Sequence, residues 1–224
     1  MCINAEVSLI TFLSSSAMAG YLWYRNEIKT NDRPIAIWIF VIAMMQFFEF
    51  LMWSNMNNHS FVSKLSLVFI LLQPLSLAIG LYVYNSYNQF IYNDIPFGKY
   101  LLWTIIIISG IKVLYTIYYV FIEKSNEIWK SEKGPNCHLV WYFMKNMKHL
   151  PFLIRPNILY LAPIVLSTLL IKPLFPLGLI FTMFGFITFH LTKYIYGMEW
   201  GSIWCWLINI MGLFAISSKY LLGL

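Results

Sequence analysis

Charged residues are scarce in this sequence. Only 11% of its 224 residues are Asp, Glu, Lys or Arg, whereas soluble domains average about 25%. Hydrophobic residues make up 60% of the chain. A soluble domain of this size needs more charge than this to cover its surface, so the composition excludes that class of protein.

Three other patterns are missing. No block alternates apolar and polar residues, which excludes a transmembrane β-barrel. The net charge of +6 forms no basic stripe, so nothing indicates nucleic-acid binding, and attraction to anionic lipid headgroups accounts for it. The cysteines (Cys2, Cys137 and Cys205) have no CxxC spacing, which argues against a zinc ribbon or a dithiol redox site.

What the sequence does contain is a series of apolar blocks of roughly 20 residues, the length of a helix that crosses a 30 Å hydrocarbon core. They predict an all-α fold, a polytopic membrane bundle of seven transmembrane helices in a single transmembrane domain over residues 1–224. The predicted spans are about 5–23, 34–54, 61–84, 100–122, 151–171, 175–196 and 200–221.

Residues 123–150 form the longest polar segment between predicted spans. In its second part, His138, Lys145 and Lys148 alternate with apolar and aromatic residues. This pattern is compatible with a short amphipathic helix lying in the membrane interface. A structured loop after Gly134-Pro135-Asn136 is the alternative, and both interpretations stay open.

Basic residues are nearly balanced between the two sides of the predicted bundle, so the positive-inside rule does not orient it. Two features favour an outer or lumenal N-terminus and a cytoplasmic C-terminus. Cys2 and Cys137 fall on the N-terminal side, where an oxidising compartment would allow them to pair. The only N-x-S/T sequon, Asn58-His59-Ser60, lies on the same side.

Glu49 is the most unusual residue in the apolar blocks. It lies in the second predicted span, within Gln46-Phe47-Phe48-Glu49-Phe50-Leu51-Met52-Trp53. A carboxyl group in hydrocarbon costs several kcal/mol unless it is paired or protonated, so it is a candidate functional group. The alternative is that Glu49 only pairs with another side chain to fix the packing of the helices.

Depth along the spans groups other polar residues with Glu49. The even-numbered spans run in one direction and bring Glu49, Lys112 and His190 to the half of the membrane nearer the N-terminal side. These positions predict a polar cavity that opens toward that side, with Lys112 as the partner of Glu49. The candidate ligand- or ion-binding residues are Glu49, Gln46, Gln73, Lys112, His190, Glu6 and Asn209.

Simpler interpretations exist for two of these residues. His190 lies near a helix end, where a single histidine is commonly a packed or interfacial residue. The long side chain of Lys112 allows its ammonium group to reach the membrane surface.

Two further features are typical of transporters. Gln73-Pro74 places a helix breaker beside an amide in the third span, although a plain kink is the alternative. A faint repeat aligns Phe48-Glu49 with Phe189-His190 and gives a 3+1+3 arrangement of helices. Repeats of this kind place substrate sites at the interface between the two halves.

Three short stretches carry a family resemblance. They are Met1-Cys2-Ile3-Asn4-Ala5-Glu6-Val7-Ser8-Leu9, the Met-Gln-x-x-Glu of Met45–Glu49, and the Trp-Gly-Ser-x-Trp-Cys-Trp of Trp200–Trp206. The chain resembles an uncharacterised multi-span integral membrane family of large DNA viruses and protists, which has tryptophan where this chain has Ile3. The resemblance implies no function, and it draws attention to Glu6, Glu49 and the start of the last span.

Three functions stay open. The first is a small transporter or channel-like protein, with the lipid bilayer as its environment, a small solute or ion as its ligand, and Glu49 as the proton- or ion-coupled group. The second is a structural or interaction protein of a membrane, including a viral one. The third is an intramembrane metal-dependent hydrolase, for which Glu49 and His190 are the only available ligands. No catalytic residue set, metal site or cofactor is predicted.

Overall fold

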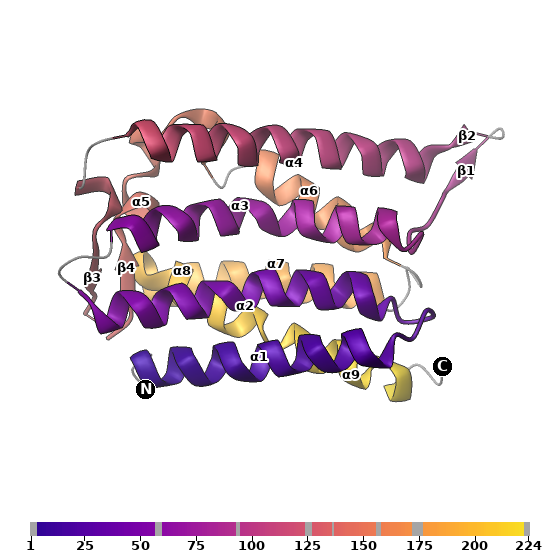
Figure 1. Ribbon diagram of the computed structural model, residues 1–224, viewed down its shortest axis with the longest axis horizontal. Coiled ribbons are helices and arrows are strands. Elements are labelled where there is room, and N and C mark those ends of the chain that lie inside the picture. The colour runs from indigo at the N-terminus through magenta and orange to yellow at the C-terminus, as the bar shows by residue number, and fades with distance from the viewer. Residues whose placement is uncertain are drawn as a thin grey trace.

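The structure of the protein is a computed structural model that describes residues 4–56, 60–92, 95–123, 127–135, 137–155, 158–171 and 177–221. Helices dominate, and Figure 1 shows them lying along one common axis. The long ones are α1 (Ala5–Arg25), α2 (Asp32–Ser54), α3 (Ser60–Val83), α4 (Phe97–Ile122), α6 (Ile158–Leu170), α7 (Leu179–Tyr196), α8 (Trp200–Ile208) and α9 (Met211–Leu221).

Six segments in the described part of the chain are long and apolar enough to cross a membrane. They are Asp32–Ser54, Ser60–Val83, Phe97–Ile122, Phe152–Leu170, Leu179–Tyr196 and Trp200–Tyr220. The prediction of an all-α, multi-pass membrane protein is therefore confirmed.

The first predicted span, residues 5–23, is not among these six. It corresponds to α1, which contains a run of three serines and has a charged residue near each end. The helix begins at Asn4, whose side chain accepts a hydrogen bond from the Val7 amide at 2.9 Å, and it ends at Asn26 in the left-handed conformation. α1 packs along α2 (Figure 1), so it belongs to the bundle without being confirmed as a span.

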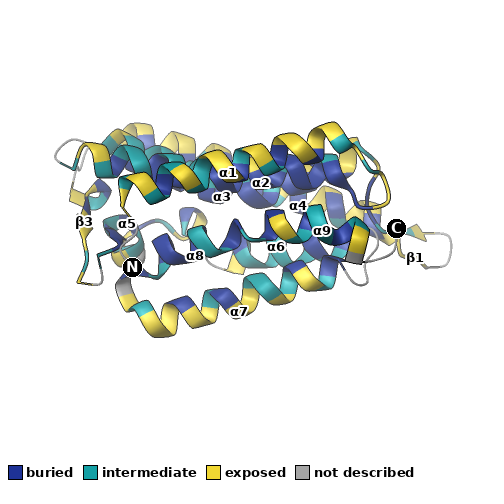
Figure 2. Cartoon of the chain, turned by 90° about the horizontal axis from the view of Figure 1, so that it is seen from below, coloured by how far each residue is buried: buried dark blue, intermediate teal, exposed yellow. Residues whose placement is uncertain are grey.

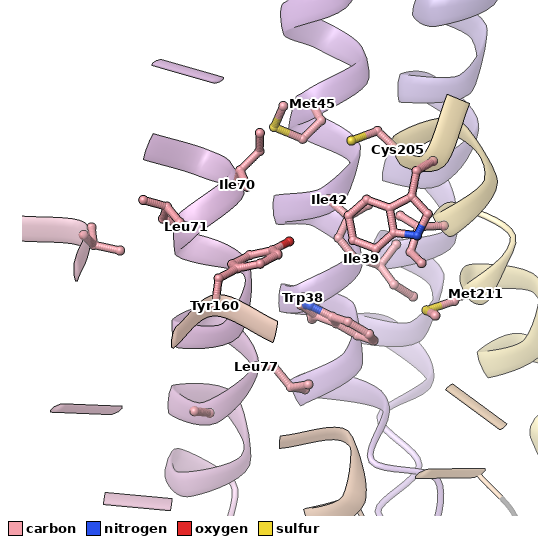
Figure 3. Packing of buried hydrophobic residues seen from close by; sticks show 14 of the residues in the cluster. Trp38, Ile39, Ile42, Met45, Ile70, Leu71, Leu77, Tyr160, Cys205 and Met211 are labelled. Atoms are coloured by element: carbon pink, nitrogen blue, oxygen red, sulfur yellow. The ribbon is translucent and has the colours of Figure 1, made fainter. Parts of the chain in front are cut away.

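The core of the bundle lies around α2 and α3. Figure 2 shows these two helices with mostly buried residues, whereas α7 lies at the edge with many exposed ones. Figure 3 shows how side chains from α2, α3, α6, α8 and α9 interlock at the centre. Trp38, Ile39, Ile42 and Met45 on α2 are all at most 2% exposed. The second predicted span is therefore a central helix, in contact with helices from both ends of the chain.

A folded cap covers the end of the bundle at which α1 begins (Figure 1). It is formed by residues 127–149, which include the 3₁₀ turns η1 (Glu127–Trp129) and η2 (Met147–His149), an antiparallel hairpin of β3 (Ser131–Lys133) with β4 (Leu139–Trp141), and the four-residue helix α5 (Tyr142–Lys145). The described part of residues 123–150 thus combines a hairpin with short helical turns.

Aromatic packing holds the cap on the bundle. Trp129, Trp141 and Phe143 are buried, and the rings of Trp141 and Phe143 stack with centroids 5.6 Å apart. The hydroxyl of Ser131 donates to the sulfur of Met52 at 3.4 Å, which joins the hairpin to the end of α2. The end of the bundle that was expected to open is therefore closed.

Two of the spans are interrupted helices. The fifth consists of the 3₁₀ turn η3 (Phe152–Ile154), an extended residue at Arg155, and then α6, which has 13 residues and so extends about 20 Å. The last consists of α8 and α9, with a turn between them at Asn209. By contrast, α3 continues through Pro74, so Gln73-Pro74 is not a break in the helix.

The opposite end of the bundle carries a short hairpin of β1 (Ile91–Tyr92) and β2 (Ile95–Pro96). Figure 1 places the two chain ends at opposite ends of the bundle, with the C-terminus on the side of this hairpin. Cys2 and the sequon residues Asn58 and His59 lie outside the described residues.

Candidate functional site

The Glu49 side chain is completely enclosed by the bundle. Its exposed fraction is 0%, and neither carboxyl oxygen makes a hydrogen bond with any residue that the structure describes. None of the ion pairs among the described residues includes it. Burial of a carboxyl group without an ion pair is energetically costly, since a low-dielectric interior disfavours an unpaired charge.

Polar side chains from two helices face Glu49. Gln46 lies one turn earlier on α2, and Ser202 comes from α8. Both are at most 1% exposed, and neither side chain reaches hydrogen-bonding geometry with a described residue. Cys205, one turn further along α8, is also close to Glu49. These four side chains can all donate or accept hydrogen bonds. They meet at the α2–α8 contact with almost no hydrogen bonds between them.

Tyr160 and Gln73 extend this group of side chains toward α3 and α6. The Tyr160 hydroxyl donates to the Gln73 side-chain oxygen at 2.8 Å, and both residues are at most 3% exposed. Figure 3 shows Tyr160 and Cys205 pointing toward α2 from opposite sides. We call Gln46, Glu49, Gln73, Tyr160, Ser202 and Cys205 together the inner polar cluster.

Lys112 does not pair with Glu49, contrary to the prediction. Its ammonium group donates to the backbone oxygens of Leu153 and Arg155, the latter at 3.1 Å. Both oxygens belong to the place where the fifth span is interrupted, at the end of the 3₁₀ turn η3. The depth predicted for Lys112 in α4 did not determine the direction of its side chain, which points to the interrupted span and not to α2.

His190 and Glu6 also lie away from the inner polar cluster. His190 is exposed on α7, where its ring contacts Phe186 edge to face with centroids 4.4 Å apart. Glu6 is exposed in the first turn of α1. The repeat aligned Glu49 with His190, but one is at the centre of the bundle and the other at its edge, so the packing does not support this alignment.

Asn209 marks the turn between α8 and α9. Its side-chain nitrogen donates to the Cys205 oxygen at 2.6 Å, and its side-chain oxygen is buried without a described partner. Asn209 therefore supplies a hydrogen-bond donor to one backbone oxygen at the turn between α8 and α9. Because that oxygen belongs to Cys205, Asn209 connects the inner polar cluster to this turn.

A cavity of about 470 Å³ lies between α6 and α7 and has almost entirely apolar walls. Another, of about 10 Å³, lies under the cap beside Trp141, Tyr160 and Cys205, which is at the lower limit for one water molecule. Glu49 lines neither of these two cavities.

The chemistry available to the cluster is proton uptake and release, or coordination of a small ion by oxygen atoms. No group of three or more His, Cys, Asp or Glu residues that could hold a metal ion is found in the described ranges. Glu49 and His190, the two ligands considered for a hydrolase, lie in different surroundings, so the geometry gives that function no support.

Ser202, Cys205 and Tyr160 were not among the predicted site residues. Ser202 occurs in the Trp-Gly-Ser stretch, and its polarity inside an apolar span was the one available signal. Cys205 and Tyr160 are ordinary residues for a membrane helix, and only the way the helices pack brings them to Glu49.

Six apolar spans and a buried polar cluster define this chain as an integral, multi-pass α-helical membrane protein. Comparisons with models of protein families, with curated proteins and with solved structures find no match for it. The resemblance to a family of viruses and protists gains no support from them.

Proposed function

We propose that this protein is a small transporter in which Glu49 takes up and releases a coupled proton or ion. The observation that carries the proposal is the enclosed Glu49 carboxyl group, which has no ion pair with a described residue and has the neutral side chains of Gln46 and Ser202 beside it. A group of this kind destabilises the packed bundle. A working role in proton or ion binding gives a reason for its presence.

The interrupted helices support the same function. Discontinuous helices recur at the binding sites of secondary transporters, where the freed backbone groups bind the substrate or the ion. Here Ser202 and Cys205 on α8 lie just before the turn at Asn209. A change of angle between α8 and α9 would open the inner polar cluster, so we assign the described conformation to an occluded state.

The proposal includes seven spans and an orientation. α1 runs along α2, and the two chain ends lie at opposite ends of the bundle, as an odd number of crossings requires. We place the N-terminus and the cap on the outer or lumenal side and the C-terminus in the cytoplasm. Labelling of Cys137 in the cap in intact membranes, with Cys2 and Cys205 replaced so that it is the single cysteine, would test this orientation.

Proton movement in proteoliposomes tests the function. The purified protein is reconstituted with a pH-sensitive dye inside the vesicles, and small solutes and cations are added one at a time. We expect at least one of them to drive proton movement in the wild type. Glu49→Gln, which cannot exchange a proton, should reduce that movement to the rate of empty liposomes.

Glu6→Gln is the matched control, because it removes an exposed carboxyl group from α1 and should leave the flux unchanged. Infrared spectroscopy of the same vesicles should show a carboxylic-acid band that disappears in Glu49→Gln and changes with pH in the wild type. A panel without any flux, together with a band that does not respond to pH, would overturn the proposal.

A structural role is the second candidate, favoured by the close packing of the cluster and the absence of a described cavity at Glu49. In that case Glu49 and Ser202 serve only the α2–α8 contact. A double-mutant cycle on unfolding, with Glu49→Gln and Ser202→Ala, measures their coupling. Strong coupling together with no flux would favour this role over transport.

A further inference from the structure

A large groove lies between α6 and α7 and reaches the centre of the bundle. Its volume is about 470 Å³, within the range of about 300–1,000 Å³ that is usual for small-molecule sites. Its floor includes Trp38 and Ile42 of α2, each 2% exposed overall. Trp204 and Met211 line it from α8 and α9. The groove is separate from the inner polar cluster except at Gln73.

The two walls of the groove belong to membrane spans. α6 is part of Phe152–Leu170 and α7 is Leu179–Tyr196, so an opening between them faces the hydrocarbon of the bilayer. α7 is the least buried of these segments and stands at the edge of the bundle in Figure 2. Its exposed Phe186 and Ile187 also belong in contact with lipid.

The polar groups of the groove are mostly satisfied by the protein itself. The hydroxyl groups of Thr168 and Thr182 lie 2.7 Å apart and join α6 to α7. The Val165 oxygen lies 2.9 Å from the Thr168 hydroxyl and the Gly178 oxygen 2.9 Å from the Thr182 hydroxyl, so the threonine that does not donate to its neighbour donates to the backbone. These threonines therefore offer few free partners to a polar solute, and the Trp38 indole N–H is the donor of the lining that has no described partner.

An empty apolar groove of this size is unfavourable, because its lining atoms lose dispersion contacts. Water does not replace them, since apolar cavities stay dry. The molecules that surround the opening are membrane lipids, and their acyl chains match both the chemistry of the lining and the direction of access.

We propose that the groove between α6 and α7 binds one acyl chain of a membrane lipid, which enters sideways from the bilayer and reaches Trp38 and Ile42. This site goes beyond the proposed function and does not depend on proton exchange at Glu49. Because α7 contacts the bundle mainly through α8 and less extensively through α6, the bound chain forms part of the packing on the α6 side of this helix.

Photo-crosslinking tests the proposal on the full chain in liposomes of phosphatidylcholine with a diazirine near the end of one acyl chain. After irradiation, adducts are located by peptide mass spectrometry. We expect adducts on Trp38 or Ile42, side chains that bulk lipid does not reach in the packed bundle. Ala162→Trp and, separately, Val165→Phe fill the groove from α6 and should reduce these adducts several-fold.

Leu114→Trp is the control, since Leu114 is 70% exposed on α4 and does not line the groove. It should leave the adducts on Trp38 and Ile42 unchanged. Adducts confined to exposed side chains, or an unchanged yield in both groove-filling variants, would overturn the proposal. Crosslinking in Glu49→Gln should equal that of the wild type, which separates this result from any failure of transport.

Discussion

At the scale of single residues, Glu49 and Asp32 show two opposite ways to bury a carboxyl group in α2. Asp32 is 1% exposed and accepts hydrogen bonds from Arg25 at 2.6 and 2.7 Å. Glu49 is equally buried and has no such partner among the described residues. The first arrangement is typical of a structural ion pair, whereas the second stores unfavourable free energy at one site.

Replacing Glu49 by an apolar residue of similar size should therefore stabilise the protein. We expect Glu49→Leu to raise the free energy of unfolding by about 1–3 kcal/mol, the usual cost of a buried polar group without a partner. Thermal unfolding in detergent, followed by circular dichroism, measures the change. Met45→Leu, on the same helix and also buried, is the control and should change stability little. A lower stability for Glu49→Leu would show that the carboxyl group has a stabilising partner.

His138 in the cap makes the stability depend on pH. Burial lowers the pKa of His138, and the carboxylate of Glu199 acts in the opposite direction with a smaller effect. Because its folded-state pKa lies below the unfolded value of about 6.5, the neutral ring stabilises the fold. This contribution is complete above the unfolded pKa and is lost as the pH falls through the folded pKa.

We expect the unfolding temperature of the wild type to fall as the pH is lowered below about 6.5, the unperturbed pKa of histidine. His138→Gln should flatten that part of the profile, because glutamine does not titrate. His149→Gln, which removes a more exposed histidine near the end of the cap, should keep the wild-type slope. Equal slopes for the wild type and His138→Gln would contradict the assignment.

At the scale of elements, the interruption of the fifth span depends on Lys112. Non-helical backbone inside a membrane is tolerated only where the protein satisfies its polar groups. The Lys112 ammonium group does this for the oxygens of Leu153 and Arg155, and the Arg155 side chain donates to the Leu150 oxygen at 2.6 Å. The lysine in α4 is thus a cap for a helix in another span.

Lys112→Met removes this cap while keeping the length of the side chain. We expect the free energy of unfolding to fall by about 1–3 kcal/mol, since buried backbone oxygens lose their donor. Hydrogen exchange should increase at residues 152–155, near the break. Lys64→Met removes a lysine that donates to the Glu123 oxygen at the end of α4 and should leave exchange at residues 152–155 unchanged. Unchanged exchange there in Lys112→Met would contradict the capping role.

The sequence was sufficient to predict where the helices lie along the chain. It was not sufficient to predict which side of each helix faces the centre of the bundle. Apolar blocks predict the long helices because hydrocarbon requires a helix of about 20 residues. The depth of a residue in the membrane can be predicted by the same reasoning, but the rotation of each helix about its own axis cannot. Gln46 and Glu49 were found because they are polar in an apolar block, whereas Lys112 and His190 were assigned to the wrong neighbours. The break at Arg155 has a local signal, because Pro156 disfavours a helical conformation of the residue before it, but the lysine that donates to this segment lies 43 positions away in the chain.

At the scale of the whole molecule, the first and last helices are joined by Arg25. Its guanidinium group binds Asp32 and also donates to the Ile216 oxygen of α9 at 2.7 Å. A second, more exposed ion pair joins Lys219 of α9 to Glu27 at 3.7 Å. These contacts close the bundle at the end opposite the cap.

Asp32→Ala should weaken the contacts that join the first and last helices at this end of the bundle. It leaves the Arg25 guanidinium, whose side chain is 10% exposed, without its carboxylate, and breaking a buried pair in this way costs about 3–5 kcal/mol. Thermal unfolding measures the loss. Glu127→Ala breaks the exposed pair with Lys130 and should cost about 0.5 kcal/mol or less. A similar small loss in both variants would show that the Arg25 pair does not hold the bundle together.

The interrupted fifth span has a consequence for the order in which the chain is made. Synthesis proceeds from the N-terminus, so α2 and α4 enter the membrane before residues 153–155 and 202 exist. Until then Lys112 has no carbonyl group to cap and Glu49 has no Ser202 to face. A chain that stops after α4 therefore lacks the groups that Lys112 and Glu49 contact in the folded bundle.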